Sequence, residues 1–356
     1  MLKKLTAILF SLVIGITLFS GCSCSGDPLS FDRANGFSGG EKPSAVHTEK
    51  LIYDVTFSET DDYYKKDALL KDNVKLEFTD GRYISEFKVL GSVSSVDSDI
   101  LAIDGLSEIY YLSTEFSIKF KISSENDSKE HVDTITTKVY FAPQGYSFAP
   151  IYSETETDCL IPRVNDTDFI VYRAVSKYAV KYNMNGYEST LESAYLSGEN
   201  IDKDGSEITF DEKTTKEKAE FRKYIDNAQL LFALRNIRLT EKTNFSLPVL
   251  SESYGKPQTL SVTNESALER DITIKLNGTT YSEKIKYDAL SYRISSTNSA
   301  GLKQYVQIQS SKSDNIPDYA LPIRYARAVT LSHSSYNYPV TGTLIFDLAE
   351  AEITNG

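Results

Sequence analysis

Apolar and polar residues alternate along most of the chain from residue 47 onward. Between residues 47 and 160 the alternation is clearest in the segments 51–57, 74–78, 83–89, 116–122 and 134–141. A period of two is typical of a β-strand that buries one of its faces. The polar runs 79–82 and 123–131 stand between consecutive segments and predict hairpin turns. We therefore expect this part of the chain to form antiparallel hairpins.

The second half continues the same pattern in short segments. They are 169–172, 178–182, 187–196, 207–210, 245–250, 258–262, 271–276, 281–287, 304–308, 321–329 and 341–348. The pairs Asn185-Gly186 and Asn277-Gly278 are strong signals for tight turns between strands. Short strands at a spacing of roughly ten residues are typical of meanders, sandwiches and open barrels. The predicted fold class is mainly β, an antiparallel meander that forms a half-barrel or sandwich.

One stretch, residues 216–238, departs from the strand pattern. Apolar residues recur there at helical spacing: Phe221, Ile225, Ala228 and Phe232. This spacing predicts one main helix over 216–238, packed on a sheet through Leu230, Leu231 and Leu234. Asp226 offers an alternative, because an aspartate favours the N-cap position and can begin a separate, shorter helix there.

Charge divides the chain near residue 160. Acidic residues are about twice as frequent as basic ones in 22–160, whereas 161–356 is nearly balanced. This difference predicts two β-rich modules, an acidic one at 47–160 and a half-barrel-like one at 161–356 that contains helix 216–238. The hydrophobic fraction of 40% is ordinary for a globular chain. The net charge of −12 supplies no basic face for phosphates, so nucleic acid is not an expected partner.

The N-terminus carries a targeting pattern in residues 1–21. Lys3 and Lys4 precede an apolar stretch, 6–19, which is shorter than the ~20 residues of a membrane-spanning helix. The small residues directly before Cys22 resemble the lipobox of bacterial lipoproteins. That resemblance implies cleavage before Cys22, acyl chains such as palmitate on the modified residue, and lipid anchoring on the extracytoplasmic face of a bacterial membrane. Cys24 is the second candidate for the modified residue, and a plain signal peptide is the alternative.

Residues 22–46 are rich in Ser, Gly and Pro and show neither strand nor helix periodicity. They predict a flexible tether between the anchor and the folded part. The tether contains a G-x-S-x-G match at 36–40. A nucleophile elbow needs a strand before the serine and a helix after it, and neither is predicted here.

Metal-binding patterns are weak throughout the sequence. The three histidines, His47, His131 and His333, are widely spaced and form no cluster with the cysteines. The run 202–206 resembles the start of a calcium loop, but position twelve is Lys213 where a glutamate is required. We therefore expect no metal and no cofactor. A disulfide between Cys24 and Cys159 is possible but not required.

Several second-half segments resemble a bacterial cell-envelope family of unknown function. They are the strand 178–182, the helix 226–235 with Gln229 where serine is usual, the strand 245–249, and the closing segments 321–325 and 342–344. The resemblance covers about half of the chain and leaves 48–160 outside it. It implies a half-barrel wrapped around a helix, similar to periplasmic lipoprotein carriers. It implies no established activity and no catalytic residues.

Taken together, these patterns predict a membrane-anchored, extracytoplasmic lipoprotein that is not an enzyme. Its expected partners are the membrane, through Cys22, and an apolar or envelope-derived ligand on the concave face of residues 165–354. Adhesion to glycans or proteins through exposed tyrosines such as Tyr336 and Tyr338, or a purely structural role, is the alternative. A hydrolase is a further alternative that no motif supports. The 24 tyrosines and 17 phenylalanines do not decide between these functions, because both residue types favour strands.

Overall fold

A computed structural model describes most of the chain from residue 48 onward. The described residues are 48–59, 75–90, 108–142, 148–164, 169–183, 186–197, 208–209, 213–218, 225–235, 244–250, 257–294, 304–310, 313–317, 319–331 and 340–354. The predicted signal peptide (1–21), the predicted tether (22–46) and the two N-terminal cysteines, Cys22 and Cys24, lie outside them.

The described residues form one sheet of sixteen strands and one short helical segment. The elements are β1 (Thr48–Glu59), β2 (Lys75–Leu90), β3 (Ile109–Ser123), β4 (Ser128–Phe141), β5 (Pro150–Val164), β6 (Phe169–Asn183), β7 (Gly186–Ser197), β8 (Ile208–Thr209), β9 (Lys213–Lys218), β10 (Ile225–Asp226), the 3-10 helix η5 (Asn227–Gln229), α2 (Leu230–Arg235), β11 (Asn244–Leu250), β12 (Pro257–Leu276), β13 (Thr279–Ile294), β14 (Gln304–Gln309), β15 (Pro322–Leu331) and β16 (Val340–Thr354). The predicted mainly β fold class is confirmed.

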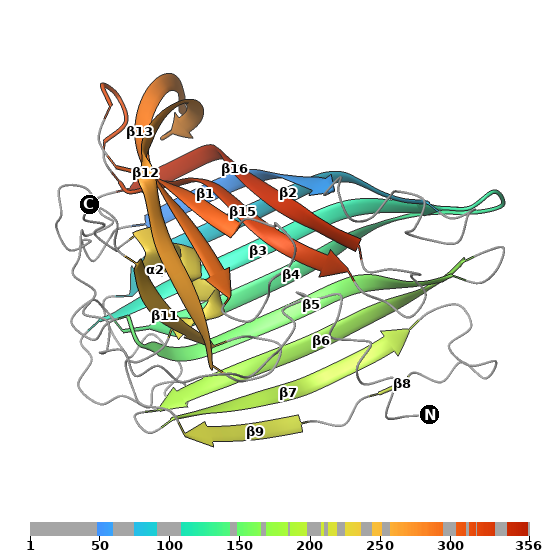
Figure 1. Cartoon of the computed structure of the whole chain (residues 1–356). Coiled ribbons are helices and arrows are strands. Elements are labelled where there is room, and N and C mark those ends of the chain that lie inside the picture. Colours follow the sequence, from blue (N-terminus) through green and yellow to red (C-terminus); the bar gives the residue numbers. More distant parts are fainter. Residues whose placement is uncertain are drawn as a thin grey trace.

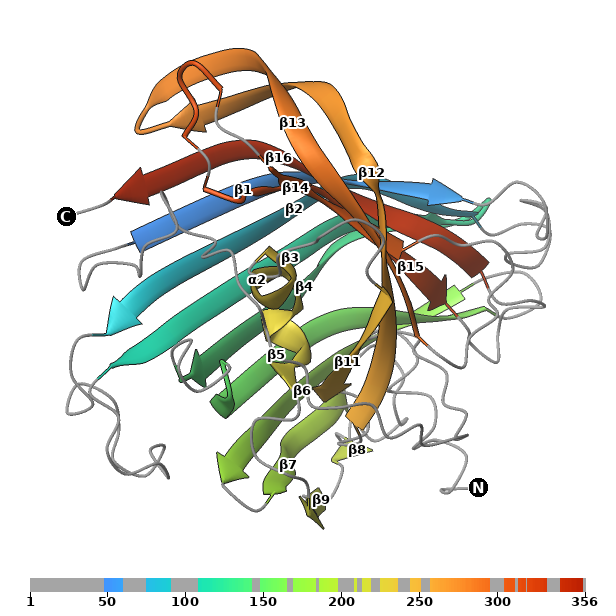
Figure 2. The same ribbon diagram turned by 60° about the vertical axis from the view of Figure 1, so that its left-hand side comes forward.

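Most neighbouring strands are consecutive in sequence and antiparallel, as in a meander. The exception that joins the two halves is β1, which pairs with β16 on one side and β2 on the other. Leu276 of β12 also pairs in parallel with Ala351 of β16, so strands β12 to β16 form a closed barrel. The remaining strands continue the sheet beyond this barrel as a wide, strongly curved surface (Figures 1 and 2).

The sheet is continuous across residue 160, where the charge pattern placed a boundary between modules. Strand β5 spans that position and pairs with β4 on one side and β6 on the other. The predicted boundary therefore does not separate two sheets. Surface charge and backbone pairing are independent here, because the charged side chains project from the sheet while its hydrogen bonds run within it.

Several predicted strands are parts of longer ones. The expected turn at 79–82 lies inside β2, where a register shift between Phe78 and Asp80 accommodates the polar residues. The segments 169–172 and 178–182 belong to β6, and 258–262 and 271–276 belong to β12. A break in hydrophobic alternation thus marks an irregularity within a strand in these places. By contrast, the predicted tight turn at Asn277-Gly278 is confirmed, with positive φ angles of 47° and 83°.

The helix is much shorter than the predicted span of 216–238. Lys216 to Lys218 lie in strand β9, and the helical residues run from Asn227 to Arg235. The start at Asp226, which the sequence offered as an alternative, is confirmed. Asp226 accepts a hydrogen bond from the Ala228 backbone nitrogen, and the Gln229 side chain accepts one from the Asp226 nitrogen. This capping box fixes where the helix begins.

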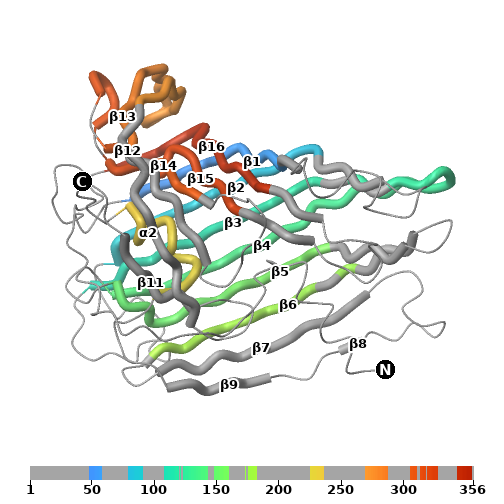
Figure 3. Tube along the Cα trace, viewed as in Figure 1, coloured from blue at the N-terminus to red at the C-terminus, as the bar shows by residue number. Residues whose placement is uncertain are grey.

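The concave side of the sheet carries the core. Alternation is strict on β1, where Leu51, Tyr53 and Val55 are buried and belong to a cluster shared with β12 to β16. A second, aromatic cluster joins Phe232 of α2 to residues of β2, β3 and β4. Figure 3 traces the backbone of these elements. Of the three helix leucines that the sequence assigned to the packed face, Leu230 and Leu234 are buried, whereas Leu231 is only half-buried.

Candidate functional site

Many residues that the sequence patterns singled out lie outside the described part of the chain. They are Cys22, Cys24, His47, His333, Tyr336, Tyr338, and the segments 36–40 and 202–206. Cys159 is described and lies on β5 with only 4% of its surface exposed. Its thiol is free, and the disulfide with Cys24 that the sequence allowed cannot be placed because Cys24 lies outside the described residues. Burial raises the pKa of the Cys159 thiol, which disfavours the reactive thiolate.

His131 is the one histidine within the described ranges. Its Nε2 lies 3.5 Å from Oδ1 of Asp133, and burial lowers the pKa of His131. Across those ranges, no group of three or more His, Cys, Asp or Glu side chains is arranged to hold a metal ion. Among the helices that the structure describes, none is long and apolar enough to cross a membrane.

The concave face is occupied at one end by Phe232 of α2. Its ring stacks on Phe87 with centroids 4.9 Å apart, and the rings of Phe141, Phe148 and Tyr110 surround it at 5.1, 5.4 and 6.4 Å. The helical spacing in the sequence correctly placed Phe232 on a packed face. The rings around Phe232 all lie outside residues 165–354, where the sequence placed the apolar concavity, so α2 packs on the part of the concave face formed by the first half of the chain.

Polar contacts at the start of α2 hold the helix against the sheet. The Tyr182 hydroxyl donates to Oδ2 of Asp226 over 2.5 Å, and the Gln229 amide donates to the Phe148 carbonyl oxygen over 2.9 Å. Burial raises the pKa of the Asp226 carboxyl, which outweighs the lowering effect of the hydrogen bonds from Ser153 and Tyr182. The helix is therefore positioned by specific polar contacts as well as by aromatic packing.

An ion pair holds the other end of α2. Arg235 donates to both carboxylate oxygens of Glu49, with 2.9 Å between Nη2 and Oε2, and to the Tyr319 carbonyl oxygen over 2.7 Å. The pair was not predicted, although the sequence contains a signal for one of its members. Glu49 occupies an inward position of the same alternation that buries Leu51 and Tyr53, and a carboxylate at such a position needs a partner.

A row of hydroxyl side chains continues the concave face of β4, β5 and β6 away from Phe232. We call it the hydroxyl strip, and it comprises Thr137, Ser153, Thr155, Thr157 and Ser176. Its hydroxyls bond to one another or to the helix cap. Thr137 pairs with Thr155 at 3.1 Å, Thr157 pairs with Ser176 at 2.5 Å, and Ser153 bonds to the Asp226 side chain.

Four of the strip residues are buried, with exposed fractions between 4% and 6%. Because each hydroxyl already has a partner, the strip needs no water to satisfy its polar atoms. The strip is therefore less polar than its residue types suggest.

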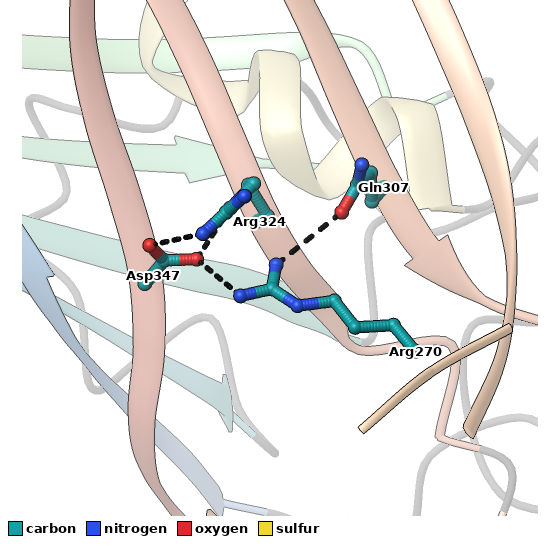
Figure 4. Close-up of polar contacts among 4 residues, drawn as sticks. All are labelled: Arg270, Gln307, Arg324 and Asp347. Atoms are coloured by element: carbon teal, nitrogen blue, oxygen red, sulfur yellow. Dashed lines mark hydrogen bonds and ion pairs between the residues drawn. The ribbon is translucent and has the colours of Figure 1, made fainter. Parts of the chain in front are cut away.

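A separate polar cluster, which we call the arginine–aspartate cluster, consists of Arg270, Gln307, Arg324 and Asp347 (Figure 4). Nε and Nη2 of Arg324 donate to the two oxygens of Asp347 over 2.5 and 2.6 Å. Arg270 donates to the same carboxylate over 3.2 Å. Burial alone raises the pKa of Asp347, but the hydrogen bonds and charges of Arg324 and Arg270 lower it overall.

The sequence did not predict this cluster. Its members come from β12, β14, β15 and β16, and only strand register reveals that Gln307, Arg324 and Asp347 lie directly opposite one another. Asp347 alternates with Phe346 and Leu348, which are buried in the core. Its side chain therefore points away from the face of β16 that carries those two residues.

Comparisons with known proteins give a similarity in structure but none in sequence. No protein-family model matches the sequence, and no curated protein matches it either. Among solved structures, the chain is similar to a β-barrel-like protein of the domain of unknown function DUF1849 from Brucella abortus. The identity is 9%, the match covers 88% of this chain and 100% of that chain, and the TM-score is 0.37.

Proposed function

We propose that this chain is a lipoprotein anchored by lipid at Cys22 on the extracytoplasmic face of a bacterial membrane, and that it is not an enzyme. Its folded part holds a lipid-like ligand along the hydroxyl strip. The anchor rests on the sequence, where a basic start and a short apolar stretch end in Ser20-Gly21-Cys22. The ligand rests on the concave face.

The observation that carries the ligand proposal is the self-paired state of the hydroxyl strip. A polar group buried under an apolar ligand is costly unless it already has a hydrogen-bond partner. Thr137 and Thr155 satisfy each other, and Thr157 pairs with Ser176. An acyl chain lying over these residues therefore leaves no polar atom unsatisfied. Because Phe232 of α2 occupies one end of the concave face, such a ligand is limited to the part of that face beyond α2.

Metabolic labelling with a fatty-acid analogue tests the anchor. We expect the wild-type chain to carry the label and the Cys22→Ser variant to lack it, because the thiol of Cys22 is the proposed acceptor. Label that survives in Cys22→Ser and disappears in Cys24→Ser would move the anchor to Cys24. Equal labelling of the wild type and the double variant would overturn lipid anchoring at either cysteine.

Ligand binding is tested on the purified full chain in a nonionic detergent. Extraction with organic solvent followed by mass spectrometry should release a co-purified lipid, and a fluorescent fatty acid should bind saturably. Thr155→Phe places a ring on the strip and should weaken binding. Thr136→Phe, on the opposite face of β4, is the matched control and should not. An absence of both co-purified lipid and saturable binding would reject the proposal.

Adhesion to a glycan is the second candidate, favoured by a row of tyrosines on the other face of the sheet. Tyr111, Tyr140 and Tyr152 come from three adjacent strands, with ring centroids 5.0 and 6.3 Å apart. All three are half-buried, so part of each ring is available for stacking on a sugar. Retention of the chain on an insoluble envelope glycan, reduced in Tyr140→Ala, would favour this candidate over lipid binding.

A further inference from the structure

We propose that the arginine–aspartate cluster binds a singly charged oxyanion, the chemistry shared by a phosphodiester lipid headgroup and the dihydrogen form of free phosphate. This site is distinct from the hydroxyl strip and goes beyond the function proposed above. Arg270 and Arg324 supply the binding groups, and Asp347 holds them in position. Figure 4 shows the two guanidinium groups converging on the same carboxylate.

The first argument is the charge of the cluster. Two guanidinium groups share one carboxylate, which leaves one positive charge without a counter-charge. The same row of the sheet continues through Asp54, opposite Asp347, to Arg82, opposite Asp54. Asp54 and Arg82 carry opposite charges, and Arg82 also acts on Glu350, which Lys275 contacts at 3.1 Å, so the excess of one positive charge is that of the four cluster residues. A singly charged anion is the ligand that neutralises it.

The second argument is the number of hydrogen-bond donors. Arg324 alone satisfies both oxygens of Asp347 through a bidentate contact. Arg270 gives one N–H to Asp347 and makes one long contact of 3.5 Å with Oε1 of Gln307. A guanidinium has five N–H donors in a planar fork that suits phosphate and carboxylate oxygens. Arg270 therefore retains three donors for a ligand.

The third argument is accessibility. The side chains of Arg270, Arg324 and Asp347 are exposed by 30%, 29% and 35%, so the cluster is neither sealed in the core nor fully in solvent. Partial burial strengthens charge interactions because it lowers the effective dielectric constant and reduces screening by salt. If the cluster only linked β12 to β16, one arginine on Asp347 would suffice.

Calorimetric titration of the full chain in nonionic detergent tests the site with three probes. They are inorganic phosphate, glycerophosphoglycerol as a headgroup without acyl chains, and phosphatidylglycerol mixed into the micelles. Arg270→Gln removes the excess charge and leaves the Arg324–Asp347 pair intact. Gln307→Glu cancels the charge without removing an arginine. Arg173→Gln is the control, because Arg173 makes a similar pair with Asp158 elsewhere on the sheet.

We expect saturable binding that weakens about tenfold or more in both cluster variants and is unchanged in Arg173→Gln. Binding of inorganic phosphate and glycerophosphoglycerol would identify a general oxyanion site, and binding of glycerophosphoglycerol without inorganic phosphate would identify the lipid headgroup. Binding of phosphatidylglycerol alone, weakened in both cluster variants, would identify a membrane lipid whose acyl chains also contribute. Three results would overturn the proposal: no saturable binding of any probe, binding that neither cluster variant weakens, or equal weakening in the control. The fatty-acid titration described above does not depend on this outcome.

Discussion

Arg235 and Glu49 form a buried ion pair although 186 residues separate them in the sequence. Their side chains are exposed by only 3% and 4%. The pair joins the last residue of α2 to the start of β1, and it lies beside Tyr53, whose hydroxyl donates to the Pro322 carbonyl oxygen. It therefore ties the helix to both ends of the folded chain, because β1 lies next to β16.

The pair predicts strong coupling between its two members. Arg235→Leu leaves Glu49 buried without a counter-charge and should lower the free energy of unfolding by about 3–5 kcal/mol. Adding Glu49→Leu should recover most of that loss, since the uncompensated charge is then gone. Urea denaturation of the two single variants and the double variant measures the coupling. Strictly additive losses would show that the two side chains do not interact.

An exposed pair provides the matched control. Lys50 and Glu86 lie 3.2 Å apart, with side chains exposed by 39% and 33%. Solvent screens such a pair, so Glu86→Gln should change the free energy of unfolding by less than about 1 kcal/mol. A comparable loss in Glu86→Gln and Arg235→Leu would mean that burial does not explain the effect.

The helix leucines predict a contrast within α2. Leu234 is fully buried, and Leu234→Asp should lower the free energy of unfolding by about 3 kcal/mol or more because it buries a carboxylate without a partner. Leu231 is half-buried, and Leu231→Asp should cost only about 1 kcal/mol, since its carboxylate can reach water. Melting temperatures of the two variants provide the measurement. Equal shifts would place both leucines in the same environment, contrary to the structure.

Asp226 predicts a pH dependence of stability. Burial raises the pKa of this carboxyl in the folded state, so the folded chain holds the proton more tightly than the unfolded chain does. Its contribution to stability is fully present below the ordinary aspartate pKa. That contribution is lost as pH rises from the ordinary value through the raised one. Asp226→Asn keeps a side-chain oxygen for the N-cap and does not titrate.

The free energy of unfolding of Asp226→Asn should therefore gain on that of the wild type as pH rises through this window. Denaturation curves at several pH values between 3 and 8, roughly the range over which a buried aspartate titrates, provide the measurement. Asp127→Asn, in the exposed turn between β3 and β4, serves as the control. A constant difference between Asp226→Asn and the wild type at all pH values would contradict the prediction.

Strands were predictable from the sequence because the pleat puts alternate residues on one face. Leu51, Tyr53 and Val55 show the pattern, and the structure buries all three. The helix was overestimated because apolar spacing alone does not separate a helix from neighbouring strand residues. The local signal at Asp226 and Gln229 was the better guide, since a capping box is a direct interaction between nearby residues.

The polar sites were not predictable in the same way. Arg270, Arg324 and Asp347 are far apart in sequence, and each stands in a strand whose register the sequence does not specify. Their meeting depends on β12 curving back to β16. The hydroxyl strip also depends on register, because Thr137 faces Thr155 only once β4 and β5 are aligned. Alternation assigns a residue to a face of its strand but does not identify its neighbour across the sheet.

Gly81 gives the last prediction, which separates crowding from backbone strain. A Cβ at this position would lie 3.0 Å from Cβ of Val55 and 3.1 Å from its carbonyl oxygen, so β1 would have to move. Gly81→Ala and Gly81→Asn should each lower the free energy of unfolding by about 1–3 kcal/mol.

Gly278 is the comparison, since its φ of +83° is strained for a side chain while nothing lies within 4 Å of a Cβ placed there. Asparagine tolerates that conformation, so Gly278→Asn should lower the free energy of unfolding less than Gly278→Ala does. The difference between the two variants should be below about 1 kcal/mol. Urea denaturation of the four variants measures both effects. Rescue of Gly81 by asparagine would contradict crowding as the cause.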